Sequence, residues 1–444
     1  MKKIFCFFIF LFFSICNSVF VFATTLKDAL QLAYKNSDAV GMQYYKKDIS
    51  KLDFYKSLTN FVPSVDVSYS FMPFAKMDMT ASPSMTTMMA RMAPMMGGGL
   101  PAGGGDNNYN NSHSVQASAT LPLSFYKTIP GAIGANKNRT ASIYEYDEFL
   151  ENFGLLFIQK YMDVIFYTKA KKVYEQMSET YDKKLKKVTV MNAYGSAKRD
   201  KVVLAEAQLY ENKANEITTN SSLDRAKMEY KIITGEEPDD LQIPDMSNFK
   251  LPVKTKQEFI DLVLENNSGM KKLKKQYEAQ KYAMTTQSLS ALPDLFVSYS
   301  YMYMKGNDLT IKSNYIGVGA SWSFNGRGKP IIEARKSYTN YRIAGLNIVL
   351  KKKELEQDAG YNWDQYFASV ELVKATEKAL KASRDSLKEV KISVSTGTAT
   401  FIDEMDIETQ YLNANLNYLK AQKALILSYY KLISMTGVGM LTIK

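Results

Sequence analysis

Two aspartates spaced three apart carry the clearest chemical pattern in this sequence. Asp403 and Asp406 lie in a stretch of helical periodicity, where residues three apart share one face of the helix. Carboxylates gathered in this way attract cations when several copies of them meet. Thr400 and Asp403 also fit a capping-box pattern that starts a helix and needs no ligand, although this second interpretation leaves Asp406 unexplained.

A second group of potential ligands is a stretch rich in methionine and glycine. Thioethers are soft ligands that suit Cu(I) or Ag(I), so the stretch could bind these ions. The alternative is a low-complexity loop without a metal, because composition alone does not define a site. The methionines are Met72, Met77, Met79, Met85, Met88, Met89, Met92, Met95 and Met96.

No residues form a pattern for catalysis. The single histidine, His113, stands beside a Ser- and Asn-rich segment without a cysteine or clustered carboxylates near it. The glycines of "NGRGKP" at 325–330 lack the spacing of a phosphate-binding loop and predict a turn. We therefore expect neither an enzyme nor a cofactor.

The N-terminus has the features of a secretory signal peptide over residues 1–23. Lys2 and Lys3 precede an apolar run, and Ala23 provides a small residue at the cleavage site. An uncleaved anchor is the alternative, while lipid attachment at Cys16 is disfavoured by the bulky Ile15 before it. Because both cysteines lie in this segment, the mature chain has no thiol chemistry.

The rest of the chain is a tandem duplication. Pro63 and Tyr69 recur as Pro293 and Tyr299, and other pairs further on recur at a second constant offset. The second offset is smaller than the first, so the first copy has extra residues between the two sets of pairs. We assign this insertion to the Met-rich stretch. The copies are 24–235 and 255–437, with a linker at 236–254 and a tail at 438–444.

Each copy is predicted to run helix, strand, strand, long helix and return helix. The strands alternate apolar and polar residues, and the long helices repeat apolar residues every seven positions, as in a coiled coil. In the first copy these elements are helix 25–61, strands 64–72 and 113–125, long helix 135–192 and return helix 197–233. In the second copy they are helix 255–291, strands 294–304 and 314–324, long helix 330–395 and return helix 399–434.

In this order of elements, and in one motif, the chain resembles the TolC-like trimeric outer membrane ducts, a family of outer membrane efflux proteins. The motif is "STGTATFIDEMDIETQYLNANLNYLKAQ" at 395–422, and "AYGSAKRDKVVLAEAQLYENKAN" at 193–215 is a looser version. The resemblance implies a homotrimer whose strands form a 12-stranded barrel in the outer membrane lipid, continued by a periplasmic barrel of coiled-coil helices. It also implies docking onto a periplasmic adaptor protein and an inner-membrane pump.

The resemblance assigns roles to four residues. Gly195 and Gly397 would mark the turns at the periplasmic tips, and Asp403 and Asp406 would ring the pore and raise one another's pKa. The family's well-studied member closes its tip with an arginine and a tyrosine, where this chain has Ala399 and Val394. The first copy has Lys201 and Leu204 in place of the aspartates, so the second hairpin alone would form the ring.

Two alternatives stay open from the sequence. The first is a duct dedicated to copper or silver, in which the Met-rich stretch forms an extracellular loop. The second is a coiled-coil tether that conducts nothing, which would leave the alternating strands unexplained. The chain has 56 Lys and Arg against 45 Asp and Glu. We attribute this excess mainly to solvated helix faces, with a basic lumen as the alternative, and expect no nucleic acid partner for a secreted chain.

Overall fold

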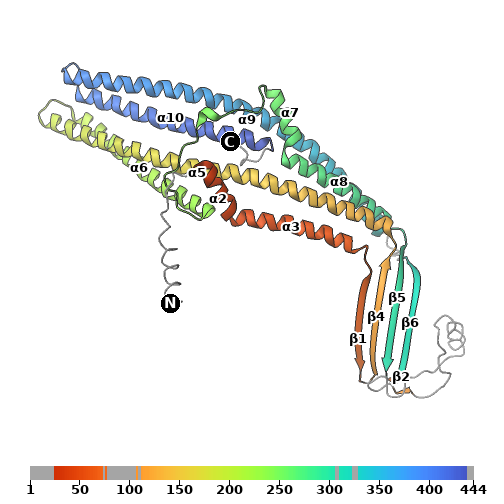
Figure 1. Ribbon diagram of the computed structural model, residues 1–444. Coiled ribbons are helices and arrows are strands. Elements are labelled where there is room, and N and C mark those ends of the chain that lie inside the picture. Colours follow the sequence, from red (N-terminus) through yellow and green to blue (C-terminus); the bar gives the residue numbers. More distant parts are fainter. Residues whose placement is uncertain are drawn as a thin grey trace, which may run out of the picture. The chain divides into compact units, whose positions relative to one another are not determined.

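The protein is mostly helical and carries one four-stranded sheet, as the computed structural model shows (Figure 1). The structure describes residues 25–73, 76–77, 107–108, 112–305, 310–322 and 329–437. The predicted signal peptide, most of the Met-rich stretch and the predicted tail lie outside these ranges. The first unit comprises residues 1–45, 144–271 and 350–444, and the second comprises 46–143 and 272–349. Each unit therefore combines segments of both sequence copies.

The sheet belongs to the second unit and is antiparallel, in the order β1-β4-β5-β6. Its strands are β1 (Ser64–Met72), β4 (Ser112–Pro122), β5 (Asp294–Lys305) and β6 (Thr310–Ser321). The short strands β2 (Lys76–Met77) and β3 (Asn107–Asn108) pair with each other inside the Met-rich insertion.

The register places apolar side chains on one face of the sheet. Val65 pairs with Ala119, which pairs with Tyr299, which in turn pairs with Ile316. One position along, Ser64, Thr120, Ser298 and Gly317 form a polar or small row on the opposite face. Because side chains alternate across a strand, the predicted alternation produces an apolar and a polar face.

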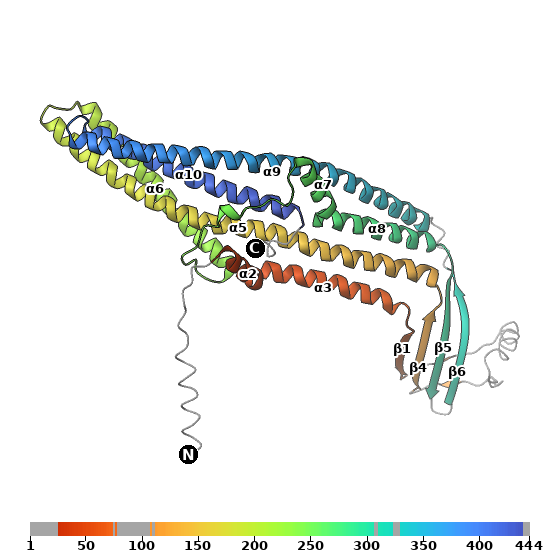
Figure 2. The same ribbon diagram turned by 45° about the horizontal axis from the view of Figure 1, so that its top comes forward.

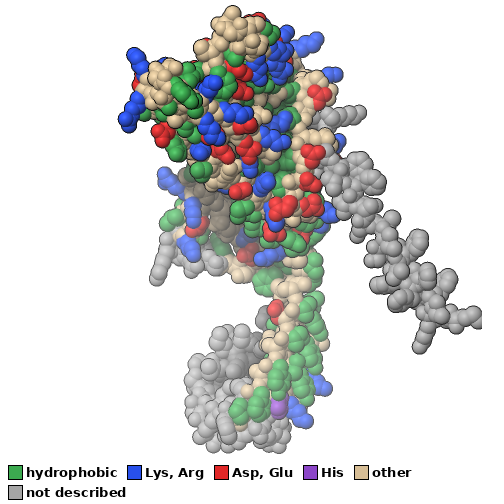
Figure 3. Space-filling view, turned by 90° about the vertical axis from the view of Figure 1, so that its left-hand side faces the viewer, with side chains coloured by type: hydrophobic (Ala, Val, Ile, Leu, Met, Phe, Trp, Pro, Cys, Tyr) green, Lys and Arg blue, Asp and Glu red, His purple; other side chains and the backbone are tan. Residues whose placement is uncertain are grey.

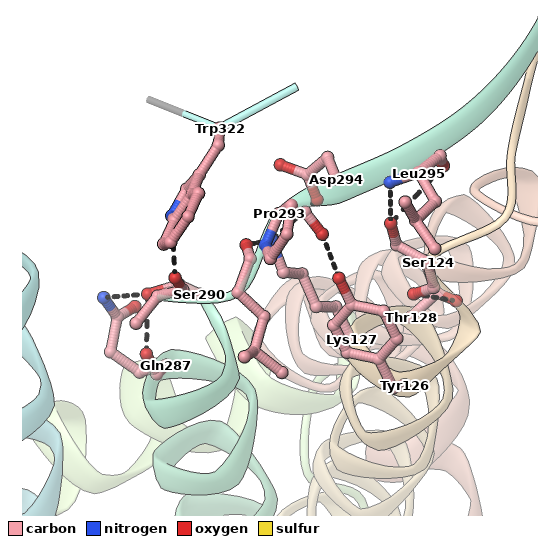
Figure 4. A network of polar contacts seen from close by, with 12 residues as sticks. Ser124, Tyr126, Lys127, Thr128, Gln287, Ser290, Pro293, Asp294, Leu295 and Trp322 are labelled. Atoms are coloured by element: carbon pink, nitrogen blue, oxygen red, sulfur yellow. Dashed lines mark hydrogen bonds and ion pairs between the residues drawn. The ribbon is translucent and has the colours of Figure 1, made fainter. Parts of the chain in front are cut away.

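The strands join the helices of the second unit through a network of polar contacts (Figure 4). The Lys127 ammonium lies 2.7 Å from the Asp294 carboxylate and donates to the Leu292 carbonyl. The Ser124 hydroxyl accepts from the Leu295 amide at 2.7 Å, and the Trp322 indole donates to the Ala291 carbonyl at 3.1 Å. These bonds fix the end of the sheet nearest the helices.

Two long helices and the return helices that follow them carry most of the remaining described residues. The first long helix, α5 (Phe125–Ala193), turns into α6 (Arg199–Thr234), and the second, α9 (Lys329–Ser395), turns into α10 (Phe401–Met435). Both hairpins appear clearly in Figures 1 and 2. Residues 246–248 form a 3-10 turn, η1 (Met246–Asn248), within the predicted linker.

The structure corrects two predicted helices, each of which is broken. The helix predicted at 25–61 is α2 (Leu26–Asn36) and α3 (Asp38–Thr59), and the one at 255–291 is α7 (Lys256–Asn266) and α8 (Ser268–Leu289). Ser37 and Asn267 separate the helices. The Asn267 carboxamide accepts from the Met270 amide, so it caps α8 and competes with helix continuation.

Side chains at both breaks bond to the last turn of the return helix of the same copy. Asn36 donates from Nδ2 to the Thr234 carbonyl at 2.7 Å, and Asn267 donates from Nδ2 to the Met435 carbonyl at 3.3 Å. Helix ends leave carbonyls without intrahelical partners, and these amides satisfy one at each end. Each sequence copy is thereby closed on itself.

Other bounds differ from the predicted ones at element ends. The strand predicted at 113–125 ends at Pro122, and α5 begins at Phe125 instead of 135. Pro130 lies inside this helix, where it has no amide to bond to the carbonyl four residues before it, so the second turn of α5 lacks one regular hydrogen bond. The strand predicted at 314–324 is Thr310–Ser321, and α6 and α10 each begin two residues later than predicted because Lys198 and Thr400 before them have an extended backbone; only Thr400 caps its helix with its side chain.

The core of the first unit lies where α2, α5, α6 and α10 meet. Its largest fully buried side chains include Phe157, Ile158 and Tyr161 of α5 and Ile426 of α10. The Tyr161 hydroxyl donates to the Gln242 carbonyl at 2.7 Å, which also attaches the linker to this core. A second apolar cluster continues along α5, α6 and α10 towards the hairpin turns.

Candidate functional site

The two hairpin turns have the same backbone geometry. Gly195 has φ +71° and Gly397 has φ +76°. The Ser196 amide donates to the Met191 carbonyl at 2.8 Å, and the Thr398 amide donates to the Ser393 carbonyl at 2.9 Å. Both bonds span five residues around a left-handed residue, as in a Schellman motif. Glycine is favoured at both positions by φ alone, since a Cβ added at either one would meet nothing within 4 Å.

Asp403 caps α10 from within the helix. The Thr400 amide donates to the Asp403 carboxylate at 2.8 Å, and the Asp403 amide donates to the Thr400 hydroxyl at 3.2 Å. Hydrogen bonds from the Thr400 hydroxyl and amide hold the pKa of Asp403 below its usual value. A ring of aspartates, which requires further copies of the chain, would instead raise the pKa of Asp403. The shift within one chain is therefore opposite to the one expected from the ring.

Asp406 makes a different contact from Asp403, because its carboxylate forms an ion pair with Lys184 of α5. The Lys184 side chain is only 8% exposed, whereas that of Asp406 is 52% exposed. Lys184 also donates to the Gln208 side-chain oxygen of α6 at 3.1 Å. The buried Lys184 ammonium thus joins the first hairpin to the first turns of α10 in the second hairpin.

Further polar contacts extend this junction. The Thr180 hydroxyl of α5 donates to the Glu408 carboxylate of α10 at 3.1 Å. Deeper in the bundle, the Ser178 hydroxyl donates to the Glu216 carboxylate at 2.6 Å and receives a bond from Asn212 at 2.7 Å. We name Thr180, Lys184, Asp406 and Glu408 the hairpin junction.

Sequence reasoning missed the α5 half of the hairpin junction. Lys184 lies three residues after Tyr181 and four before Val188, two buried residues of the predicted seven-residue repeat. It therefore occupies a core position of the coiled coil, where a charged residue signals a specific partner. The spacing could have identified Lys184, although it could not have identified Asp406 as the partner.

Val394 and Ala399, the residues that depart from the family pattern, take part in the second turn through their backbone. The Val394 carbonyl accepts from the Gly397 amide at 3.2 Å, and the Ala399 amide donates to the Ser393 carbonyl at 3.2 Å. Both side chains are partly exposed. The Thr398 hydroxyl donates to the same Ser393 carbonyl at 3.1 Å, which adds a side-chain bond within the turn.

A cavity of about 540 Å³ lies in the first unit, beside the two helix breaks. Tyr34, Tyr146, Asp147, Glu151, Ser268 and Lys271 are among its lining residues. Glu151 is buried and accepts from the Ser268 hydroxyl at 2.7 Å. Burial, together with the nearby Asp147 and Glu148 carboxylates, raises the pKa of Glu151 to about 7 against the lowering effects of Ser268 and Lys271.

The other predicted candidates give no site in the described ranges. Met72 ends β1 and Met77 ends β2, while Met79, Met85 and the later methionines lie outside the described residues. Within those ranges, no three or more histidine, cysteine or acidic side chains come together as they would around a metal ion. The His113 ring shares a hydrogen bond of 2.7 Å with the Tyr69 hydroxyl. Of "NGRGKP", only the last two residues are described, and they begin α9.

Across the described part of the chain, none of the helices combines the length and the apolar composition needed to cross a membrane.

Comparison with curated proteins finds relatives by sequence. The chain is 23% identical over 297 residues to outer membrane protein TolC of Escherichia coli strain K12, and 24% identical over 283 residues to that of Salmonella enteritidis. The first match covers 62% of this chain and 58% of TolC, so the chain spans well under two thirds of that relative's length. No protein-family model matches the chain.

Solved structures share the fold over nearly the whole chain. The Campylobacter jejuni CmeC outer membrane channel has a TM-score of 0.78 at 14% identity, covering 93% of this chain and 85% of that one. Outer membrane protein VceC of Vibrio cholerae has a TM-score of 0.70 at 15% identity, with 93% and 96% covered. The open-state MtrE outer membrane channel of Neisseria gonorrhoeae has a TM-score of 0.70 at 14% identity, with 94% and 89% covered.

By sequence and by fold, the chain is similar to one class of protein, the outer membrane channels. The chain is TolC-like in sequence and in fold, and the comparisons indicate an outer membrane location with a periplasmic part. The relatives and neighbours named above are outer membrane proteins and channels, and none is named as an enzyme.

Proposed function

We propose that the protein is the outer membrane channel subunit of a tripartite efflux or type I secretion system. Three copies would pool their sheets into a 12-stranded barrel, and the hairpins would form a periplasmic conduit. The turns at Gly195 and Gly397 would dock onto a periplasmic adaptor and an inner-membrane pump. The resemblance to TolC and the channel fold support this proposal, and one feature of the sheet carries it.

That feature is an apolar sheet face with two open edges. Val65 and Val67 of β1 are each 70% exposed, and Val318 of β6 is 81% exposed. Within the described residues, β1 and β6 each pair on one side only. Because unpaired strand edges are costly in lipid, the edges must meet other strands there. A β6 edge that pairs with β1 of the next copy closes a barrel and turns the apolar face to lipid.

The length of the strands agrees with this role. The strands of the sheet have 9 to 12 residues. A tilted strand of about 9 to 11 residues crosses a bilayer. Two copies would supply about 8 strands and leave little lumen, whereas three would supply about 12 and a water-filled bore. We therefore favour the trimer.

Within this channel we propose that Asp403 and Asp406 form the selective constriction. Three copies would bring six carboxylates towards one axis and favour cations. The capping bonds of Asp403 and the ion pair of Asp406 fix both carboxylates near the start of α10. The junction with Lys184 would then couple the constriction to the first hairpin.

The experiment measures mass in detergent and conductance in planar bilayers. We expect a trimer that forms cation-selective channels. Changing both Asp403→Asn and Asp406→Asn should reduce cation selectivity and block by multivalent cations added from the periplasmic side. Asp200→Asn with Glu206→Gln, which neutralises two exposed carboxylates on α6 of the first hairpin, is the matched control. A monomer that forms no channel would refute the channel, and unchanged selectivity in the first variant would refute the ring alone.

A further inference from the structure

One end of the sheet carries cations and aromatic rings on its apolar face. Phe71 pairs with His113, and His113 pairs with Lys305. Two positions closer to the helices, Tyr69 pairs with Val115, Val115 with Tyr303, and Tyr303 with Lys312. We name Tyr69, Phe71, His113, Tyr303, Lys305 and Lys312 the basic aromatic rim. Figure 3 shows hydrophobic side chains along the sheet, with basic side chains and the histidine towards one end.

The rim side chains contact one another across strands. The His113 ring stacks on Phe71 with centroids 4.8 Å apart and shares its hydrogen bond with the Tyr69 hydroxyl. The Lys312 ammonium lies 5.8 Å from the centre of the Tyr303 ring. Lys305 and Lys312 are both exposed. The rings thus form a platform at the end of the strands, with the Lys312 ammonium against the Tyr303 ring and Lys305 beside His113 in the register.

The rim lies at a height that matches a membrane boundary. Leu295, near the junction with the helices, and Lys305 are ten residues apart on β5. At about 3.4 Å per residue these positions are about 34 Å apart along the strand. A strand tilt of about 40° reduces this to about 26 Å along the barrel axis, close to the apolar band of about 25 Å in membrane barrels. If Leu295 is at the inner boundary, the rim is at the outer one.

The charge of the rim differs from that of the opposite end of the sheet. At the helix end, Lys127 is neutralised by Asp294. Among residues of the four long strands, the only acidic ones are Asp66 and Asp294, and Asp66 belongs to the polar face. The strands therefore supply Lys305 and Lys312 with no carboxylate on the rim. Aromatic rings and lysines at a membrane boundary favour anionic headgroups.

We propose that the basic aromatic rim binds the phosphate groups of an anionic lipid in the outer leaflet, one site in each copy. The proposal rests on the proposed function, because it requires the apolar face to meet lipid. The lipid acyl chains would lie against apolar side chains such as Val67 and Ile316, and Lys305 and Lys312 would bind the phosphates at the end of the strands. Paired cations suit a headgroup that carries more than one phosphate.

The test uses the full-length protein and bis-phosphorylated lipid A as the probe. Purified wild type is first checked for its trimeric mass in detergent and for conductance in phosphatidylcholine bilayers. Native mass spectrometry then gives the affinity for bis-phosphorylated lipid A and for its phosphate-free counterpart. The variant Lys305→Gln with Lys312→Gln removes the cations and keeps the rings. Lys378→Gln with Lys381→Gln, two exposed lysines of α9, removes equal charge elsewhere.

We expect the rim variant to bind the bis-phosphorylated lipid about 30-fold more weakly, since each lysine near a headgroup contributes about fivefold. The α9 variant should bind as wild type does, and neither variant should alter the affinity for the phosphate-free lipid. If wild type is a conducting trimer and the rim variant keeps the wild-type affinity for the bis-phosphorylated lipid, the rim site alone is overturned. The same holds if the rim variant and the α9 variant lose this affinity equally. A chain that forms no trimer and no channel would overturn the proposed function and the rim with it.

Discussion

Glu151 offers a direct test of the packing around the helix breaks, through the change Glu151→Gln. The carboxyl is buried beside Ser268, and its pKa in the folded protein is raised from 4.5 to about 7. Between these two pH values the folded state holds a proton that the unfolded state has released. Folding stability must then fall as pH rises from 4.5 to 7, and the full penalty is present above pH 7. Glutamine is neutral at every pH and still accepts the Ser268 hydroxyl, so it escapes this penalty.

The magnitude follows from the shift. The rise from 4.5 to about 7 corresponds to an upper limit of about 3 kcal/mol at 1.36 kcal/mol per pKa unit. An unfolding entropy of about 2.1 cal/mol/K per residue gives about 0.9 kcal/mol/K for the 444-residue chain. The variant should therefore melt above wild type at pH 8, by at most about 3 to 4 °C. The two proteins should melt together near pH 4.5.

The assay is thermal unfolding followed by circular dichroism in one detergent, at several pH values between 4.5 and 8. Glu145→Gln is the control, because Glu145 is an exposed carboxyl on the same helix. It should change the melting temperature equally at all pH values. If Glu151→Gln shifts the melting temperature by the same amount at pH 4.5 and pH 8, the carboxyl is not held neutral by burial, and this reasoning is wrong.

Two further predictions concern the hairpins. Asp406→Ala leaves the ammonium of Lys184 buried without its carboxylate and should lower the free energy of unfolding by about 1 to 2 kcal/mol. Lys184→Met removes the buried charge itself and should be neutral or stabilising. Chemical denaturation measures both variants, and equal losses of stability would contradict this asymmetry. Gly195→Ala and Gly397→Ala place a Cβ at positive φ and should each cost about 1 to 2 kcal/mol, while Gly41→Ala inside α3 should stabilise by about 0.5 to 1 kcal/mol, which the same denaturation series measures.

The sequence was informative where structure follows from local pattern. Alternation along 64–72 indicated a strand with an apolar and a polar face, and β1 has that pattern in its register with β4. Asp403 was recognised as a possible cap because Thr400 stands three residues before it, and both capping bonds are present. Each of these features depends on residues a few positions apart, so the sequence contains the necessary information.

Features that depend on distant residues were not predictable in the same way. The breaks at Ser37 and Asn267 fall within continuous helical periodicity, and they are stabilised by bonds to return helices far along the chain. The ion pair of Asp406 requires Lys184, which lies 222 residues earlier. Periodicity gives the face on which such a residue lies, but the identity of its partner comes from tertiary packing. The predicted pore ring is a further step of this kind, because it requires other copies of the chain.

The bonds at the helix breaks also have a consequence for the order of folding. Asn36 bonds to Thr234 within the first copy, and Asn267 bonds to Met435 within the second, so neither bond connects one copy to the other. Each bond closes a long loop, a step that is slow because distant parts of the chain must meet. Synthesis proceeds from the N-terminus, so the first loop can close once residue 234 has been made. At that stage α2 still lacks one part of its core, because Ile426 of α10 has not yet been made. We therefore expect the first half to assemble early and to remain loosely packed until α10 arrives.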